Sequence, residues 1–272
     1  MEDKSQFFLT DTHAHLASSR FKGQLDGILV RAKERSIERI ISISCDIDDC
    51  EANLAISRQY PGVFPTVGIH PTYIHELLNS KWFEQVSTLA ENPEVVAIGE
   101  IGLDYYHPPQ DGSDVLVWRR RQREVFEQLL QLAIDRSLPV VVHQRESNAD
   151  VMAVLKNFPK VRAVLHCFTG SPEEATVALE LGHSLSFTGV VTYKNAENVR
   201  VAAAMVPADR IMIETDAPFL APVPFRGKTC EPFMVEHTAR VLSEIRGVAF
   251  EEFARLTSQN AATFFGLEYP SV

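Results

Sequence analysis

The chain has 272 residues, of which 45% are apolar and 23% are charged, close to the averages of soluble globular proteins. Its 13 glycines, 15 prolines and 16 phenylalanines exclude collagen-like and low-complexity classes. The balance of 26 basic against 36 acidic side chains gives a net charge of −10, which argues against a broad basic surface for duplex DNA. Phosphates could still bind where metal ions or a few arginines reverse the sign locally.

The four cysteines have neither C-x-x-C spacing nor the density of a disulfide scaffold, which indicates reduced thiols in an intracellular protein. Near the N-terminus the longest apolar run is Phe7–Leu9, far short of the ~7–15 residues of a signal-peptide core. No stretch approaches the ~18 apolar residues of a membrane span. We therefore expect a cytoplasmic protein without membrane contact, as a monomer or a weak oligomer.

Short β-branched runs, each followed by a stretch with helical periodicity, recur along the chain and predict eight strands. In chain order they are Phe7–Asp11, Arg39–Ser44, Val63–Gly68, Val95–Glu100, Leu138–Val142, Val161–Leu165, Ser184–Phe187 and Ile211–Thr215.

Helix signals fill the intervening stretches. The clearest amphipathic pattern covers Trp118–Ser137. A second helix begins at Ser171–Glu174, which supplies an N-cap, a proline in the first turn and a capping-box glutamate, and it ends at Gly182. Two more helices, near Pro232–Ile245 and over Phe250–Phe265, follow the last strand.

Eight strand–helix units with apolar strands indicate a parallel sheet buried on both faces. This pattern predicts an α/β protein with a (β/α)8 TIM barrel as a single domain over residues 1–272, with extra C-terminal helices. A doubly wound open sheet is the structural alternative. That fold usually opens with a glycine-rich phosphate loop, whereas the first strand here runs into Thr12–His15.

Potential metal ligands follow six of the predicted strands, at the end where barrels of this kind form their active sites. They are His13 and His15 after the first strand, His70 after the third, Glu100 after the fourth, His143 after the fifth, His166 after the sixth and Asp216 after the eighth. One histidine at a strand end would mean little, because such residues often make ordinary hydrogen bonds. Their recurrence predicts a site built from distant parts of the sequence.

The residue types favour divalent cations. His13 and His15 stand two residues apart, so extended backbone points both imidazoles to one side. A carboxylate such as Glu100, directly after an apolar strand, is costly to bury unless it is paired or binds a metal. Four imidazoles and two carboxylates suffice for two ions if one carboxylate bridges them. Imidazole donors favour zinc, manganese, iron or nickel over a purely oxygen-ligated magnesium site.

The motifs TDTHAHL, VGIHP, AIGEIGLDYY, LPVVVHQR, VLHCFTG and IMIETDAP occur in this order. Together they resemble the TatD family of metal-dependent hydrolases, deoxyribonuclease-like members of the amidohydrolase barrel group. The resemblance extends over roughly residues 7–267 and includes Thr257–Asn260 and Phe264–Leu267 near the end.

The resemblance implies two divalent cations per chain, with zinc, manganese, magnesium and nickel all open. One ion would be held by His13, His15 and Asp216, and the other by His143 and His166. Glu100 would bridge both ions. Substrate contacts would come from His70, Asp104, Tyr105 and Arg145. Glu100 and Asp216 would be the catalytic carboxylates, and Asp216 could accept the proton of the nucleophile while remaining a ligand.

The activity that the resemblance implies is that of a metal-dependent deoxyribonuclease, 3'-5' exonuclease-like, on single-stranded or damaged DNA. Two long loops, Tyr105–Val117 and Ala217–Glu231, would overhang the site, and Lys194, Arg226 and Lys228 would add positive charge near its mouth. Aromatic side chains in this region could stack on bases, namely Tyr105, Tyr106, Phe168 and Phe219. One departure is Thr229–Cys230, where many relatives carry Arg-Asn, so the substrate contact of those residues is in doubt.

Two other classes stay open. A small-molecule amidohydrolase or lactonase often bridges its metals with a carbamylated lysine, but this position is Glu100 and no lysine occurs between Lys81 and Lys156. A glutamate-bridged acyl hydrolase or a D-aminoacyl-tRNA deacylase remains possible. A non-catalytic metal- or partner-binding barrel is the third reading, against which all six ligand positions are filled.

Overall fold

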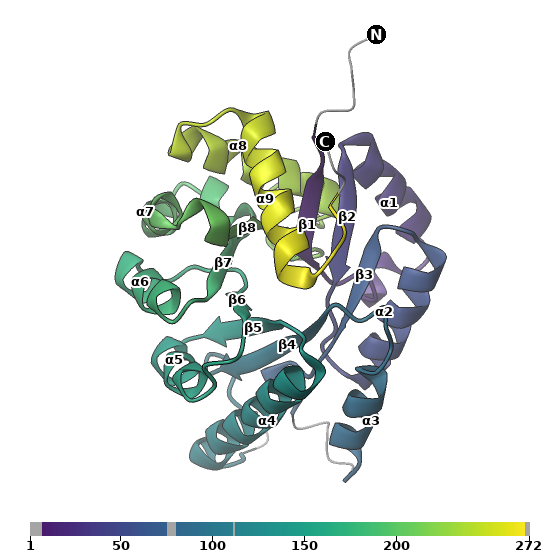
Figure 1. Cartoon of the computed structure of the whole chain (residues 1–272), viewed down its shortest axis with the longest axis vertical. Coiled ribbons are helices and arrows are strands. Elements are labelled where there is room, and N and C mark those ends of the chain that lie inside the picture. The colour runs from purple at the N-terminus through teal and green to yellow at the C-terminus, as the bar shows by residue number, and fades with distance from the viewer. Residues whose placement is uncertain (1–6, 75–79, 111, 270–272) are drawn as a thin grey trace.

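The computed structural model describes residues 7–74, 80–110 and 112–269. At its centre lies one sheet of eight parallel strands in sequence order (Figure 1). The strands are β1 (Leu9–Ala14), β2 (Ile37–Ser42), β3 (Val63–Val67), β4 (Ala97–Asp104), β5 (Val140–Arg145), β6 (Ala163–Leu165), β7 (Ser184–Phe187) and β8 (Ile211–Ile213).

Hydrogen bonds just beyond β8 close the sheet. The Asp216 amide donates to the His13 carbonyl over 2.8 Å, and the His15 amide donates to the Ala217 carbonyl over 2.7 Å. Ala14 and Ala217 form a parallel bridge at the same point. The predicted (β/α)8 TIM barrel is therefore confirmed, and the open doubly wound sheet is wrong.

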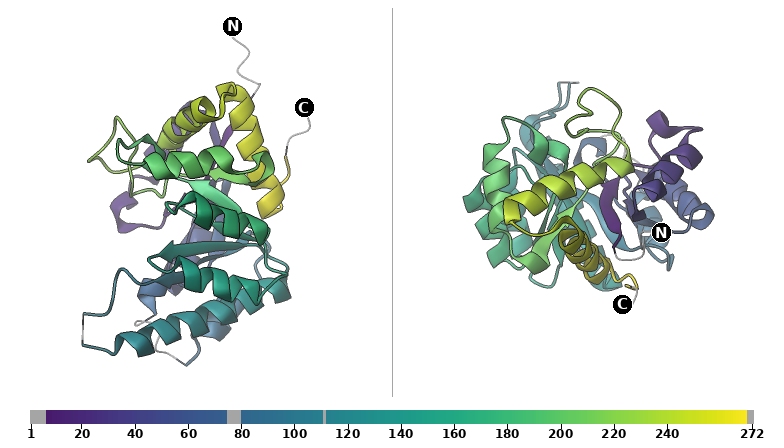
Figure 2. Two further views of the ribbon diagram at one scale, coloured as in Figure 1. Left: turned by 90° about the vertical axis from the view of Figure 1, so that its left-hand side faces the viewer. Right: turned by 90° about the horizontal axis from the view of Figure 1, so that it is seen from above.

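Helices surround the barrel on its outside (Figures 1 and 2). Those in the described residues are α1 (Leu25–Glu34), α2 (Ile47–Gln59), α3 (Trp82–Leu89), α4 (Val115–Arg136), α5 (Asn148–Lys156), α6 (Pro172–Glu180), α7 (Glu197–Met205), α8 (Val235–Arg246) and α9 (Phe250–Phe265). Short 3-10 turns cover Ser19–Phe21, Pro71–Tyr73, Gly189–Thr192, Ala208–Arg210 and Pro232–Met234. The capping box predicted for α6 is present, because Ser171 and Glu174 each bond the other's backbone amide.

Several element boundaries differ from those predicted. β4 and β5 were expected to end at Glu100 and Val142, yet they continue to Asp104 and Arg145. Their polar residues remain in the ladder because the backbone pairs regardless of which side chain faces the barrel. The helix expected from Trp118 begins three residues earlier. The Asp114 carboxylate accepts from the amide of Leu116 over 2.7 Å and so caps the first turn.

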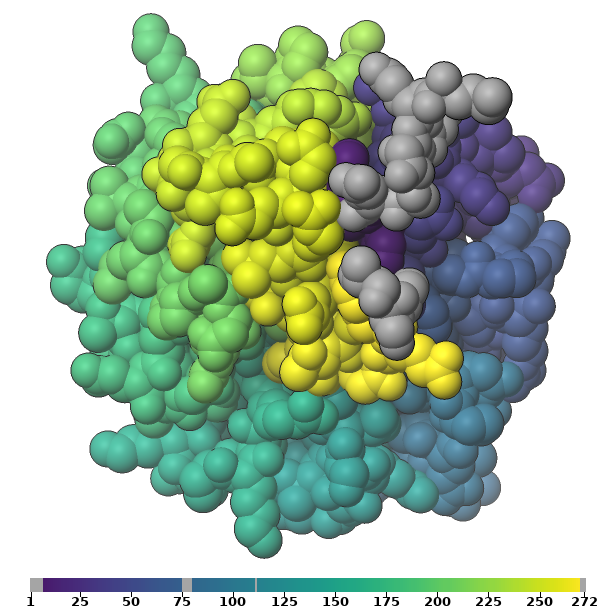
Figure 3. Space-filling model, turned by 45° about the horizontal axis from the view of Figure 1, so that its top comes forward, coloured from purple at the N-terminus to yellow at the C-terminus, as the bar shows by residue number. Residues whose placement is uncertain are grey.

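The C-terminal helix α9 closes one end of the barrel. Its side chains form a buried apolar cluster with inward-facing residues of the barrel. The members of this cluster are Ile41, Ile43, Val96, Ala97, Val141, Val164, Met212, Ala261, Phe264 and Phe265. The Ser258 hydroxyl donates to the Phe8 carbonyl over 2.9 Å, which ties the helix to the first strand's entry. Figure 3 shows α8 and α9 in yellow beside the purple start of the chain. In the described ranges, every helix is too short or too polar to cross a membrane.

Candidate metal centre

Along the strands, the side chains that face the inside of the barrel change from apolar residues to polar site residues. On β6, Val164 lies in the barrel core and His166 follows two residues later. On β8, Met212 is followed by Glu214 and then by Asp216 on the same side. Because successive side chains of a strand point to opposite faces, the same inward row changes from aliphatic residues at one end to ligating residues at the other.

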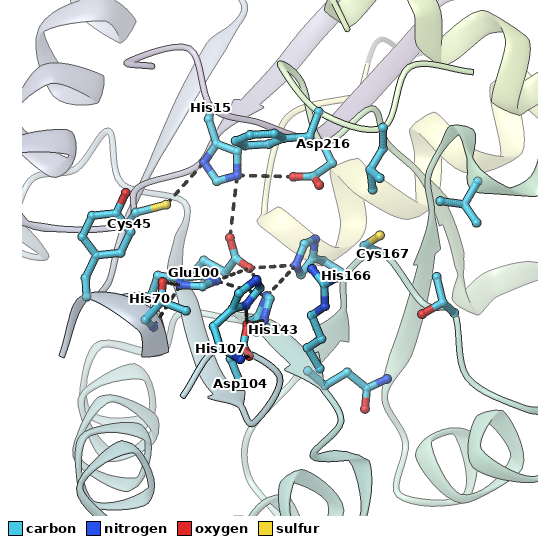
Figure 4. Close-up of a pocket in the computed structure, with 18 residues that line it drawn as sticks. His15, Cys45, His70, Glu100, Asp104, His107, His143, His166, Cys167 and Asp216 are labelled. Atoms are coloured by element: carbon cyan, nitrogen blue, oxygen red, sulfur yellow. Dashed lines mark hydrogen bonds and ion pairs between the residues drawn. The ribbon is translucent and has the colours of Figure 1, made fainter. Parts of the chain in front are cut away.

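These inward rows end in an open cavity of about 730 Å³. The sequence-predicted residues that line it are His15, His70, Glu100, Asp104, His143, Arg145, His166 and Asp216. His13 lies directly beneath the cavity floor, fully buried and within 3.3 Å of Glu100. The structure thus brings all six predicted ligand residues into one cluster. Figure 4 shows the five of them that line the cavity.

Glu100 lies at the centre of the cluster and is 2% exposed. Its Oε1 is 2.7 Å from His143 Nδ1 and 2.8 Å from His166 Nε2. Its Oε2 is 3.3 Å from His13 Nε2. Burial opposes the charge of this carboxyl, but the surrounding imidazoles outweigh burial and hold the pKa of Glu100 well below its usual value. One carboxylate therefore touches both halves of the histidine cluster.

The other half of the cluster comes from β1 and the end of β8. His13 Nε2 and His15 Nε2 face each other at 3.2 Å, and Asp216 Oδ1 lies 3.3 Å from His15 Nε2 and 3.6 Å from His13 Nε2. Asp11 holds the two strands in this register, because its carboxylate accepts from the amide and the hydroxyl of Thr215 over 2.9 and 2.6 Å. The pair of imidazoles and its carboxylate are therefore fixed by the barrel closure itself.

The donor set fits divalent cations. Imidazole nitrogens of His143 and His166 approach to 3.4 Å, as do those of His13 and His15 at 3.2 Å, and two facing ring lone pairs need a proton or a metal between them. Among the described residues, His13 Nδ1 and His166 Nδ1 are buried without a hydrogen-bond partner. His166 Nδ1 does lie 3.3 Å from the buried carboxylate of Glu214, an arrangement that orients metal-ligating histidines.

His70 differs from the other histidines in its hydrogen bonds. Its Nδ1 accepts from the backbone amide of Thr72 over 3.2 Å, so the proton of the neutral ring is on Nε2. That Nε2 lies 3.5 Å from Glu100 Oε1 and faces the cavity. Burial and the neighbouring His143 lower the pKa of His70 to about 3, which keeps the ring neutral. His70 can therefore donate a hydrogen bond from Nε2. The same nitrogen lies 3.2 Å from His143 Nδ1, and His70, Glu100 and His143 also form a group that could hold a metal ion.

Of the two residues predicted to contact substrate from the end of β4, Asp104 lines the cavity, whereas Tyr105 does not. The Asp104 carboxylate accepts from His143 Nε2 over 3.1 Å, from His107 Nδ1 over 2.8 Å, and from the amides of Tyr106 and His107 over 2.9 and 3.0 Å. Its oxygens are occupied by the protein. The Tyr105 hydroxyl donates to Asp150 over 2.7 Å, and Tyr105 is not among the described residues that line the cavity.

Among the lining residues that sequence reasoning missed, Cys45 and His107 contact predicted site residues. Cys45 places its Sγ 3.6 Å from His15 Nδ1. It stands two residues beyond Ile43 on the inward row, so strand alternation could have found it. His107 bonds Asp104 from a loop, and no periodic signal marks it.

One of the positively charged side chains expected near the cavity lies at its rim. Arg145 lines the cavity, and its guanidinium lies 4.2 Å from the ring centre of Tyr106. Phe219 also lines the cavity and is 45% exposed, whereas Phe168 is buried in the core. Arg226 instead lies over the Tyr193 ring at 3.8 Å.

Comparison with known proteins gives the family. The family model described as TatD related DNase matches residues 10–266. The chain belongs to the TatD family of metal-dependent hydrolases. It is 36% identical over 261 residues to the uncharacterized metal-dependent hydrolase YabD of Bacillus subtilis, covering 94% of this chain and 98% of YabD. It is 32% identical over 269 residues to the 3'-5' ssDNA/RNA exonuclease TatD of Pantoea vagans, covering 94% and 99%. The crystal structure of the TatD homologue YjjV from Escherichia coli matches with a TM-score of 0.88 and 29% identity over 96% of this chain and 98% of YjjV.

The sequence departure at Thr229–Cys230 has a structural consequence in this TatD protein. Cys230 is fully buried, and its Sγ lies 4.0 Å from the Thr215 carbonyl. The Cys230 side chain packs under the loop that follows β8, and Cys230 is not among the described residues that line the cavity. In this protein the position supports the backbone beside Asp216.

Proposed function

We propose that this TatD protein is a metal-dependent phosphodiesterase, a 3'-5' exonuclease that acts on single-stranded or damaged DNA. The observation that carries the proposal is Glu100, whose two oxygens each contact a different set of histidines at the base of an open cavity. A shared carboxylate of this kind is suited to two neighbouring divalent ions. The 3'-5' ssDNA/RNA exonuclease TatD of Pantoea vagans supports the choice of substrate.

In the proposed site, one ion would be held by His13, His15 and Asp216, the other would be held by His143 and His166, and Glu100 would be shared. When bound, such a pair lowers the pKa of water and neutralises the charge that develops at phosphorus. The protein's own groups fix the ligands. Asp104 orients His143 through the 3.1 Å contact, and Glu214 faces His166 from below.

Three side chains at the cavity then act on the substrate. Burial opposes the charge of Asp216, but the hydrogen bond with His15 and the nearby imidazoles hold the pKa of its carboxyl below the usual value. It is thus ionised and able to accept the proton of the attacking water. The Nε2–H group of His70 donates a hydrogen bond to a phosphate oxygen. The Arg145 guanidinium binds the same phosphate, or the next one, through two parallel hydrogen bonds.

The test is a metal-replete activity panel with single-stranded DNA, abasic duplex, RNA, a simple phosphodiester, a lactone and D-aminoacyl-tRNA. We expect single strands to be shortened from the 3' end, with activity lost on chelation and restored by added metal. Asp216→Asn should abolish turnover, whereas Asp209→Asn, an exposed aspartate in the turn before β8, serves as the matched control. Hydrolysis of only the lactone and the aminoacyl-tRNA would overturn the proposal in favour of an acyl hydrolase.

A further inference from the structure

The start of α4 carries a cluster of cations that the candidate site does not use. Arg119, Arg120 and Arg121 are consecutive and all exposed, and we call them the α4 arginine patch. The loop from β4 brings this end of α4 to the side of the molecule that bears the cavity mouth. In the left-hand view of Figure 2, that loop and the loop after β8 project to the same side.

The patch is rigidly joined to the metal centre. Gln122, the next residue, is fully buried and exchanges two hydrogen bonds of 2.9 Å with the backbone amide and carbonyl of Asp104. The Asp104 carboxylate in turn contacts His143. A single buried glutamine therefore connects the helix that carries the patch to the carboxylate that contacts a candidate metal ligand.

Among the described residues, the arginines of the patch form no ion pair. In the described part of the chain, neither Arg120 nor Arg121 has an ion-pair partner, whereas Arg123 pairs with Glu127 over 2.9 Å. The first turn of α4 holds no acidic residue, and its N-cap is Asp114.

Aromatic rings connect the patch with the cavity. Arg119 lies over the ring of Tyr105 at 4.2 Å, and Arg145 lies over the ring of Tyr106 at 4.2 Å. Arg145 itself lines the cavity. Guanidinium groups interleaved with aromatic faces are the arrangement with which proteins bind single-stranded nucleic acid, because phosphates and bases are both contacted. Exposed Val115, Leu116 and Val117 flank the patch and add apolar surface for base faces.

We propose that the α4 arginine patch binds the phosphodiester backbone of a single strand whose end lies in the metal cavity. The strand leaves the cavity past Arg145 and Tyr106 and then crosses Arg119 and its neighbours. This inference rests on the proposed function and adds to it the direction in which the substrate runs. It also predicts that affinity increases with strand length, since only longer strands reach the patch.

The test measures binding to a dinucleotide and to a single strand of about 12 nucleotides, a length within the ~4–16 nucleotide site sizes of single-strand binders. Both are titrated against the Asp216→Asn protein after elemental analysis has shown that this variant retains its ions and an activity assay has shown that it does not turn over. Replacing Arg119, Arg120 and Arg121 by glutamine should lower affinity for the long strand at least about tenfold. The salt slope should fall by about 2, the value for three phosphates on single strands. Dinucleotide affinity should stay as in the parent protein.

The matched control removes the same charge elsewhere. Lys33, Lys156 and Lys160 are exposed, and they lie at or just after the C-terminal ends of α1 and α5, away from the cavity mouth. Their replacement by glutamine should leave long-strand binding unchanged. The single variant Arg120→Gln should show about a third of the change in salt slope, which guards against misfolding of the triple variant.

The inference is overturned if the patch variant binds the long strand like the parent, or if it loses dinucleotide and long-strand affinity equally. It is also overturned if the parent protein binds anionic phospholipid vesicles through the patch while strand binding is independent of it. Because binding is measured without turnover, the result of the binding test does not depend on the result of the activity panel. If strand binding depends on the patch but no phosphodiester is hydrolysed, the proposed function is refuted and the inference about the patch is not.

Discussion

Replacing Glu100 is the most informative perturbation of the candidate metal centre. This carboxylate contacts His143 and His166 through Oε1 and His13 through Oε2. If it is a ligand of two ions, Glu100→Ala removes one ligand from each. Loss of a group that merely orients a ligand lowers metal affinity by about 10–100-fold, so loss of the ligand itself should cost at least about 100-fold at both sites.

These affinities translate into occupancies. At a free metal concentration about 100-fold above both dissociation constants, the parent protein is about 99% loaded at each site. A 100-fold loss brings both sites of Glu100→Ala to about half occupancy. His166→Ala removes a ligand from one ion, so its total should fall from about two ions to about one and a half.

The assay is elemental analysis after equilibration in metal-buffered solution, with anomalous diffraction to assign the remaining ion. Glu100→Gln, which keeps the shape and removes the charge, separates loss of the ligand from collapse of the cavity. Equal retention of both ions in Glu100→Ala would refute the shared carboxylate. Equal loss at both sites in His166→Ala would refute the division of ligands.

Three further outcomes can be measured. His183 is buried directly before β7, and burial lowers its pKa from 6.5 to about 4. As the pH falls below 6.5, the histidine is therefore protonated in the unfolded chain before it is protonated in the folded protein. Unfolding free energy at pH 5 should therefore fall by about 2 kcal/mol more in the parent than in His183→Leu, and identical pH profiles would contradict this. Asp11→Ala removes the acceptor of both Thr215 hydrogen bonds and should cost about 2–4 kcal/mol, measured by denaturant titration, together with weaker metal binding. Arg145→Ala should raise KM for single strands without changing metal content, and altered metal content would show a structural role instead.

Much of the fold could be predicted from the sequence because its signals are local. The eight strands follow from short apolar runs, and the α6 boundaries follow from the capping residues at Ser171 and Glu174, which form the predicted box. The last helix was predicted at the bounds observed, Phe250–Phe265. Strand ends were less predictable. In a barrel, polar inward residues such as Glu100 and His143 continue the ladder, whereas hydrophobicity alone marks them as the end of a strand.

The cluster of metal-ligand candidates was also predictable, since each histidine or carboxylate continues an inward row. The direction of side chains in loops was not. Tyr105 and Tyr106 are adjacent, yet one bonds Asp150 on α5 and the other lies under Arg145 at the rim. The occupation of Asp104 by His143 and His107 likewise depends on tertiary contacts between β4, β5 and a loop. No sequence period encodes such contacts.

The electrostatics of the cavity connect the two proposals. Glu100, Asp216 and Asp104 all have their pKa values held below the usual range, so without cations three buried or half-buried carboxylates would face an incoming phosphate. In a chain of net charge −10, this field repels a polyanion. Cations in the cavity reverse the local sign, and the coupling must be reciprocal, because substrate phosphate strengthens metal binding by the factor with which metal strengthens substrate binding. The α4 arginine patch is exposed to solvent, and its own positive charge does not depend on cations in the cavity. A long strand should therefore retain part of its affinity in metal-free protein, whereas a dinucleotide, which depends on the cavity alone, should lose nearly all of it.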